Sequence, residues 1–376
     1  MISTSRTNTS DNHSLTDDGI DSALFHSTVG RVCVLCLLVP IPIFAIIGNL
    51  FIIAAFARFQ SLRTPTNYFI VSLAVADLLV AVLVMPFSLV RSVDRWHFGQ
   101  CFCRAHLFLD VTFCTTSIFN LTCVALDRYI AVCDPLHYPT RMSPRRVAVM
   151  LLLCWILPLV FSSLCVSFGM YTQSPHAAIR NSTLPENQTC LATFKVPYAF
   201  ATSAISFFIP VGIMLFAYGK IFKAAQRQAR WIHAIDHHTG QLQTNHTSMR
   251  TDSSGQVHAH VDRCSLKKKE WKAVKALGLI MGVILFCWLP FFSVNIIHPL
   301  KGYGLSPLLL EASMWLGYAN SSLNPFLYGL FNKNYSHVFG AMLDWGILGR
   351  QIRAGLNSSP FGRLAHTVVT LETISR

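Results

Sequence analysis

The sequence predicts an all-α membrane protein: a seven-transmembrane helix bundle with a short amphipathic helix after span seven. Two observations support this fold class. Apolar residues make up 52% of the 376 residues and charged residues only 12%, about half the ~25% typical of soluble domains. The apolar residues also gather into runs long enough to cross a bilayer, which takes about 20 residues. This balance excludes a disordered chain and argues against a soluble enzyme.

The predicted spans follow one another along the chain, separated by polar links. They are Val32–Phe56, Asn67–Ser88, Phe102–Cys133, Val147–Phe168, Tyr198–Phe222, Ala273–Ile297 and Pro307–Phe331. A large soluble helical core is the alternative interpretation, which spaced runs of this length disfavour. The third, fifth and seventh spans carry polar residues, and we expect these residues to be functional because polar groups are costly inside a bilayer.

Lysine and arginine predict the orientation of the bundle. They concentrate in the links after the first, third and fifth spans: Arg58, Arg63, Arg141, Arg145, Arg146, Lys220, Lys223, Arg227, Arg230 and Lys267–Lys269. The positive-inside rule places these links in the cytoplasm and the N-terminus outside, at the plasma membrane. The net charge of +13 then reflects loops beside an anionic leaflet rather than nucleic-acid binding.

Glycosylation sequons agree with this orientation. Asn8, Asn12, Asn181 and Asn187 each begin an Asn-X-Ser/Thr sequon, and all four fall on the predicted outer face. We therefore divide the chain into an extracellular glycosylated tail (1–30), a seven-transmembrane domain that includes the amphipathic helix (31–343) and a cytoplasmic tail (344–376). Residues 226–265 form a flexible third cytoplasmic loop, since its middle, Ile235–Asp262, is rich in Gln, His, Thr, Ser and Gly and lacks a hydrophobic period.

Asp110 is the acid nearest the outer end of span three. It follows Cys103 by seven residues, two helical turns, so both side chains point to the same side. Cys190, in the sequon-bearing outer loop, is the natural disulfide partner of Cys103, and the bridge would hold that loop over the mouth of the bundle. A carboxylate below such a lid would suit a cation. An acid at a helix end that faces water is an equally weighted alternative.

Asp127-Arg128-Tyr129 ends span three on the cytoplasmic side. The adjacent acid and base can neutralise one another, or Arg128 can pair with Glu270 at the start of span six. A pair that a helix movement breaks would act as a switch. A static interfacial ion pair is the alternative.

Asp77 lies in the middle of span two, where an unpaired charge would be costly. Spans three and seven carry polar residues at a similar depth: Ser117, Asn320, Ser321 and Asn324. A hydrated sodium ion would fit such an oxygen-rich cluster. We expect no other cofactor.

Two prolines and a group of aromatic residues mark spans six and seven. Pro290 and Pro325 each remove a backbone hydrogen bond and predict a kink. The aromatic residues are expected in the outer third, level with Asp110: Trp288, Phe291, Phe292, Trp315 and Tyr318. An aromatic cage beside a carboxylate suits an amine.

These motifs together resemble those of rhodopsin-class G-protein-coupled receptors of the biogenic-amine group. The resemblance covers about Arg31–Leu343 and rests on Gly48-Asn49, Leu73-Ala-Val-Ala-Asp77, Cys103…Asp110, Asp127-Arg-Tyr129, Trp155, Pro210…Tyr218, Cys287-Trp-Leu-Pro290 and Asn324-Pro…Tyr328. Within the group the chain looks most like the trace amine-associated receptors, for example at Leu62–Asn67 and Trp315–Ser321. Serotonin and adrenergic receptors share parts of these segments, so a receptor for a classical neurotransmitter amine is the alternative.

The resemblance implies a ligand site around Asp110, which would bind the ammonium group and accept a hydrogen bond from Tyr318. The pocket walls would include Val111, Cys114, Trp288, Phe291, Phe292 and Asn295. In span five the hydroxyls of Thr202, Ser203 and Ser206 would bond the far end of the ligand or, alternatively, their own helix. Diamine-sensing relatives carry a second acid there, which this chain lacks, so a preference for monoamines is expected.

The resemblance also implies coupling to a heterotrimeric G protein, of the stimulatory, cyclic-AMP-raising type. Outward movement of span six would expose a docking surface that includes Arg128, Pro135, Leu136, Tyr138, Tyr218 and Tyr328. Arrestin, a receptor kinase and membrane lipid are the other expected partners. An amine transporter is a rival class, which the lack of an evident repeat disfavours. We find no constellation typical of an enzyme.

Overall fold

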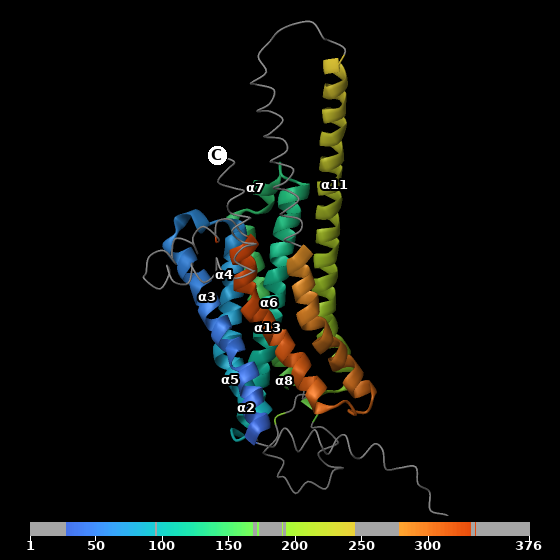
Figure 1. The fold of residues 1–376 in the computed structure, drawn as a ribbon. Coiled ribbons are helices and arrows are strands. Elements are labelled where there is room, and N and C mark those ends of the chain that lie inside the picture. The colour runs from blue at the N-terminus through green and yellow to red at the C-terminus, as the bar shows by residue number, and fades with distance from the viewer. Residues whose placement is uncertain are drawn as a thin grey trace, which may run out of the picture.

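The computed structural model of the chain describes residues 28–94, 96–167, 171–172, 190, 193–244, 278–331 and 335. Six of its helical segments are long and apolar enough to span a membrane: Thr28–Arg58, Pro65–Val93, Gly99–Cys133, Pro144–Ser167, Val196–Arg227 and Gly278–Leu300. Helix α13 (Pro307–Phe331) runs alongside them and completes a seven-helix bundle (Figure 1). The predicted fold class is confirmed.

Several spans are built from more than one element. The first comprises α2 (Thr28–Leu38) and α3 (Pro40–Arg58), and a short turn, η1 (Gln60–Leu62), leads to the second. The second comprises α4 (Pro65–Leu79), the π-helical turn η2 (Val80–Val84) and α5 (Met85–Val93). The fifth comprises α10 (Val196–Ser203), the π-helical turn η4 (Ala204–Phe208) and α11 (Ile209–Thr244).

Each π-helical turn precedes a proline. Pro86 and Pro210 lack an N–H group, and their rings would clash with the carbonyl group four residues earlier in a regular helix. Those earlier residues, Val82 and Ser206, lie within η2 and η4. Widening the helix by one residue at these points accommodates both prolines without ending the span.

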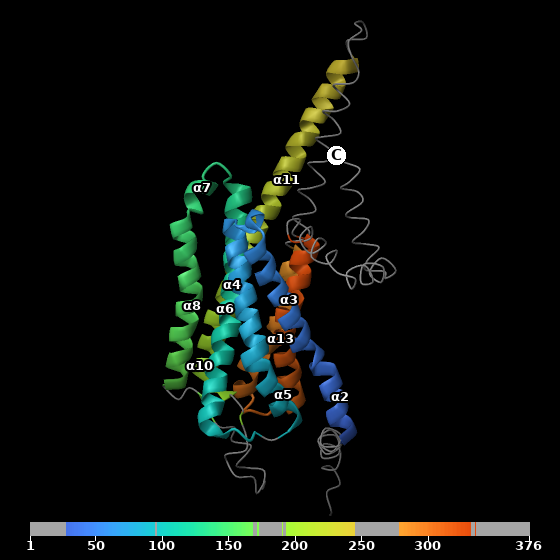
Figure 2. The same ribbon diagram turned by 90° about the vertical axis from the view of Figure 1, so that its left-hand side faces the viewer.

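The third span, α6 (Gly99–Cys133), is the central helix and packs against α4, α8 and α11 (Figure 2). It carries most of its buried polar residues in its middle turns. Helix α8 (Pro144–Ser167) lies at the edge of the bundle and exposes Leu152, Ile156 and Val160. Such an apolar outer surface is what a lipid-facing helix requires.

The two ends of the bundle differ. At the lower end in Figure 1, strands β1 (Tyr171–Thr172) and β2 (Thr193–Phe194) form an antiparallel pair with Tyr171 opposite Phe194. We call this the disulfide end because Cys103 and Cys190 lie there. The opposite end carries the short helix α7 (Tyr138–Arg141), and we call it the α7 end.

Helix α11 is longer than the sequence analysis predicts. It continues to Thr244, past the expected end at Phe222, and projects beyond the rest of the bundle (Figure 1). The predicted flexible loop 226–265 is therefore helical over 226–244, which includes the first part of its expected disordered middle, 235–262. The physical reason is local, since residues 223–234 contain alanine, glutamine, lysine and arginine, which favour helix, and no proline.

Some predicted features lie outside the described residues. These include Asn8, Asn12, Asn181, Asn187, Glu270, residues 1–27 of the extracellular tail, the cytoplasmic tail and, apart from Tyr335, residues 332–343, where the amphipathic helix is expected.

Candidate functional site

Asp110 lies half-buried on α6 toward the disulfide end, and two side chains hold its carboxylate. The Tyr318 hydroxyl donates to Oδ2 at 2.9 Å, and the Cys114 thiol donates to Oδ1 at 3.3 Å. Within the part of the chain that the structure describes, no cationic side chain forms an ion pair with Asp110. The carboxylate is therefore oriented by two hydrogen bonds and forms no ion pair with a described residue.

The predicted aromatic residues form a continuous packing arrangement across the sixth helix. Trp288 and Phe291 pack edge to face with ring centroids 6.1 Å apart, and Phe291 and Phe292 do so at 5.2 Å. Phe292 in turn stacks on Phe207 of η4 at 4.7 Å. Aromatic faces of this kind attract cations through their quadrupoles.

Trp288 also lies directly against α13. A Cβ atom added at Gly317 would lie 2.7 Å from Cζ3 of Trp288, so only glycine leaves room for the indole ring. The next residue is Tyr318, whose ring meets Trp315 edge-on at 5.4 Å. The stretch of α13 that packs against Trp288 therefore also carries Tyr318, which donates to Asp110.

Polar side chains link three helices on the side of the fifth span. Asn295 Nδ2 donates to Ser203 Oγ at 3.0 Å and to Thr202 Oγ1 at 3.4 Å, and Thr115 donates to Ser206 Oγ at 3.1 Å. Thr202 itself donates back to the Ala199 carbonyl at 3.1 Å, as the alternative interpretation expects. Ser203 and Ser206 act as acceptors in these bonds, so each hydroxyl retains a proton to donate.

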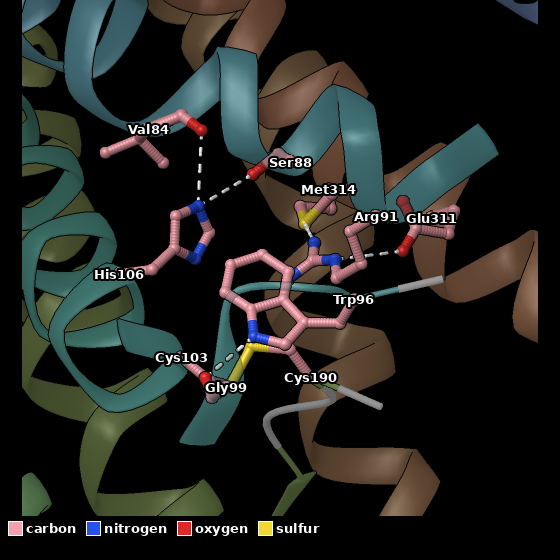
Figure 3. Close-up of a disulfide and its surroundings, with 10 residues drawn as sticks. All are labelled: Val84, Ser88, Arg91, Trp96, Gly99, Cys103, His106, Cys190, Glu311 and Met314. Atoms are coloured by element: carbon pink, nitrogen blue, oxygen red, sulfur yellow. Dashed lines mark hydrogen bonds and ion pairs between the residues drawn. A yellow bond between two sulfur atoms is a disulfide. The ribbon is translucent and has the colours of Figure 1, made fainter. Parts of the chain in front are cut away.

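A disulfide joins Cys103 of α6 to Cys190, as predicted. Both cysteines are buried, and Trp96 packs beside them, fully buried, with its Nε1 donating to the Gly99 carbonyl at 2.9 Å (Figure 3). Cys190 is therefore tied to the start of α6, on the same helix as Asp110.

Asp77 is fully buried in α4 and accepts three hydrogen bonds. Ser117 and Ser321 donate to Oδ1 at 2.8 Å each, and Asn324 donates to Oδ2 at 2.7 Å. Asn320, the fourth predicted neighbour, is also fully buried, but neither polar atom of its amide has a partner among the described residues. The same is true of the oxygens Asn324 Oδ1 and Asn120 Oδ1. The core therefore contains polar groups that the described side chains leave unsatisfied.

At the α7 end, Asp127 is fully buried and accepts from several donors. Arg128 bonds it through Nη2 at 2.9 Å, Thr66 donates at 2.5 Å, and the Tyr138 hydroxyl donates at 2.9 Å. Arg128 also donates to Thr66. Of the two predicted pairings of Arg128, the one with Asp127 is present, while Glu270 lies outside the described residues.

The link between α6 and α7 presents an ordered polar surface. Burial and the neighbouring Asp127 carboxylate raise the pKa of the Tyr138 phenol, so this hydroxyl remains a donor at neutral pH. The His137 ring bonds Asp134 at 2.7 Å and holds the pKa of that carboxyl below its usual value. Leu136, in this link, is 89% exposed.

Two tyrosines on other helices are also predicted to act at this end. Tyr218 of α11 is half-buried and Tyr328 of α13 is buried.

A family model described as "7 transmembrane receptor (rhodopsin family)" matches residues 48–328. The chain belongs to the rhodopsin family of seven-transmembrane receptors. Its named relatives are receptors for biogenic amines, so it lies in that group and is not an enzyme. The 5-hydroxytryptamine receptor 4 of Cavia porcellus is 39% identical over 329 residues, which cover 86% of this chain and 82% of the relative.

Two other relatives represent different amines. The octopamine receptor beta-2R of Chilo suppressalis is 39% identical and covers 82% of this chain and 78% of its own length. The trace amine-associated receptor 4 of Mus musculus is 37% identical and covers 79% of this chain and 82% of its own length. These similar values support the amine group as a whole rather than one of its branches.

The receptor contains two polar networks at the disulfide end that the sequence analysis missed. In the first, Tyr318 also contacts Ser88 at 3.2 Å, and Ser88 contacts His106 at 3.3 Å. His106 is buried one turn before Asp110, and its Nε2 also contacts the Val84 carbonyl at 3.2 Å (Figure 3). The network therefore extends the support of Asp110 from α13 to the second span.

In the second network, Arg91 of α5 forms an ion pair with Glu311 of α13 at 3.4 Å. Ser92 donates to Glu311 at 2.7 Å and accepts from Trp315 Nε1 at 3.0 Å. The signal in the sequence is weak: opposite charges near the end of one span and the start of another. Their pairing depends on how α5 and α13 pack.

Proposed function

We propose that this receptor binds a biogenic or trace monoamine at the cell surface and activates a stimulatory heterotrimeric G protein, raising cyclic AMP. The observation that carries the proposal is the oriented carboxylate of Asp110, held by Tyr318 and lacking a described cationic partner. An ammonium group supplies the missing positive charge and can donate hydrogen bonds to the carboxylate. The disulfide end then faces the outside, in agreement with the distribution of lysine and arginine.

The surroundings of Asp110 favour a ligand with an aromatic ring. Phe291, Phe292 and Trp288 of the sixth helix offer apolar faces. Ser203 and Ser206 of the fifth span offer hydroxyl protons. We expect the amine to lie at Asp110 and the ring to point toward the fifth span. The family resemblance at Leu62–Asn67 favours a trace amine, with serotonin or another neurotransmitter amine as the alternative.

Activation is proposed to be a shift between two populations of the bundle. In one, Arg128 is held by Asp127 and Thr66; in the other, the sixth helix moves outward around Pro290 and Arg128 becomes available to the G protein. The exposed Leu136 and the nearby Pro135 would complete the docking surface, and Tyr218, Tyr328 and the kink at Pro325 would accommodate the movement. We expect arrestin and a receptor kinase to act at the same end.

A panel of amines tests both the class and the preference. Cells that express the receptor are expected to raise cyclic AMP with arylalkyl monoamines such as 2-phenylethylamine, tyramine or serotonin. Diamines such as cadaverine are expected to be at least tenfold weaker, because residues 196–230 contain no acid to bind a second ammonium group and Glu311 is already paired with Arg91. A diamine more potent than every monoamine would contradict the site.

The cluster around Asp77 is proposed to hold a sodium ion. The carboxylate and the hydroxyls of Ser117 and Ser321 are hard oxygen ligands, and the unsatisfied oxygens of Asn120 and Asn324 fit the same chemistry. Bound sodium would add a positive charge between α4, α6 and α13, and so favour the compact population of the bundle.

Sodium is therefore expected to lower amine affinity. Replacing potassium chloride with sodium chloride at constant ionic strength should weaken agonist binding about three- to tenfold in the wild type. The variant Asp77→Asn should lose this dependence, whereas Asp134→Asn, which neutralises a partly exposed acid outside the cluster, should keep it. Equal sodium effects in the wild type and in Asp77→Asn would refute the site.

A further inference from the structure

We infer that the groove between α6, α7 and α8 at the α7 end binds the headgroup of an anionic phospholipid. The groove has a volume of about 450 Å³. Its apolar floor includes Leu126, Ile130 and Met150, and its rim carries Arg141, Arg145 and Arg146. The inference rests on the orientation proposed above, which places this end in the cytoplasm.

The three arginines come from two elements and are only partly neutralised. Arg141 pairs with Asp134 at 3.2 Å. Arg146 uses Nη1 to donate to the Thr140 carbonyl at 3.2 Å, which holds its side chain near α7. Arg145 forms no hydrogen bond or ion pair with any residue that the structure describes. The rim therefore has an excess of positive charge and free donors for phosphate oxygens.

The apolar floor indicates that the anion belongs to a lipid. The groove opens beside the outer face of α8, where Val149, Leu152 and Leu153 are each about half exposed. This face of an edge helix contacts bilayer chains, so the acyl chains of a lipid held by the arginines can lie along it. An acidic peptide segment would match the rim but not this apolar surface.

Anionic lipids are concentrated where this site would lie. The cytoplasmic leaflet carries phosphatidylserine and phosphoinositides, and basic pockets between helices on that side bind their headgroups. Each arginine near the surface contributes roughly a fivefold gain in affinity for such a leaflet. Removing two of them should therefore cost on the order of 25-fold.

The test measures lipid binding to the purified full-length receptor in detergent by native mass spectrometry. Dioleoyl phosphatidylserine and dioleoyl phosphatidylcholine share acyl chains, so their difference reports on the headgroup. We expect the wild type to bind its first molecule of phosphatidylserine at least tenfold more tightly than its first molecule of phosphatidylcholine. Arg145→Gln/Arg146→Gln should lose most of this preference, while its binding of phosphatidylcholine should not change.

The matched control is Arg58→Gln/Arg63→Gln, which removes two exposed charges from the same end outside the groove. It should bind phosphatidylserine within twofold of the wild type. Equal losses in both double variants, or equal wild-type affinity for the two lipids, would overturn the inference. Arg145→Gln alone breaks no described contact, so a three- to tenfold loss there shows that misfolding is not the cause.

The lipid site and the amine site can fail separately. Asp110→Asn should bind phosphatidylserine as the wild type does, because Asp110 lies near the other end of α6. Arg145→Gln/Arg146→Gln should bind amine as the wild type does. If the preference for phosphatidylserine persists in a receptor that no amine activates, the lipid inference stands without the proposed ligand.

Discussion

Replacing Asp110 with asparagine is expected to lower amine potency at least 100-fold while the receptor still reaches the cell surface. An ammonium–carboxylate pair at 4 Å has roughly 4 kcal/mol of Coulomb attraction at an effective dielectric constant of 20, before desolvation. About 2.7 kcal/mol corresponds to a 100-fold change in affinity. Asparagine keeps the shape and can still accept the hydrogen bond from Tyr318, so the loss would report on charge. Cyclic AMP dose–response curves, with surface expression measured in parallel, check this result.

Two further variants distinguish the effect of the Asp110 charge from the effect of its orientation by Tyr318. Tyr318→Phe removes the 2.9 Å hydrogen bond to Asp110 but keeps the ring, so a loss of about tenfold is expected. Asp94→Asn removes an exposed acid from the same end and should leave potency within twofold. A full response in Asp110→Asn would remove the ammonium anchor from the proposal.

Gly317→Ala is expected to destabilise the receptor by about 1–3 kcal/mol, the range typical of overpacking. The new methyl group would lie 2.7 Å from Cζ3 and 2.9 Å from Cε3 of Trp288, and this large ring, which is buried and packs against both Phe291 and Phe292, has little room to move. Either the ring or α13 must shift, and a shift of α13 displaces Tyr318. We therefore expect both a lower melting temperature of the purified receptor and an amine potency reduced by at least tenfold.

The matched control for this change is Gly282→Ala. Gly282 lies in the same helix as Trp288, and a Cβ atom there meets nothing within 4 Å among the described atoms. This alanine should leave the melting temperature unchanged or raise it, since alanine favours helix over glycine. The double variant Gly317→Ala/Trp288→Phe should recover stability, because the smaller ring restores space. Identical melting curves for the two glycine variants would refute the steric argument.

The sequence predicts the span positions well because membrane spans depend on local composition. Runs of about 20 apolar residues are visible without knowledge of the fold, and the disulfide follows from the position of Cys103 and Cys190. The neighbours of Asp77 can also be predicted from the sequence, since Ser117, Ser321 and Asn324 lie at matching depths in their spans.

Contacts that depend on helix rotation were harder to predict. The bonds from Thr66 and Tyr138 to Asp127 join three segments, and nothing in their spacing indicates that they meet. The ion pair between Arg91 and Glu311 likewise requires the relative rotation of α5 and α13. Helix α11 extends past its predicted end because hydropathy detects the membrane boundary and not the end of the helix.

The π-helical turns η2 and η4 change which residues reach the interior. A regular helix rotates about 100° per residue, so one extra residue in a turn rotates everything after it by about that amount. Ser88, Arg91 and Ser92 all follow η2, and their contacts with α6 and α13 depend on this rotation. Ser206 lies within η4 itself. Gain or loss of a single residue in these turns would therefore replace one set of inward-facing side chains with another while both helix ends stay in place, which offers receptors of this fold a short mutational route to a different ligand.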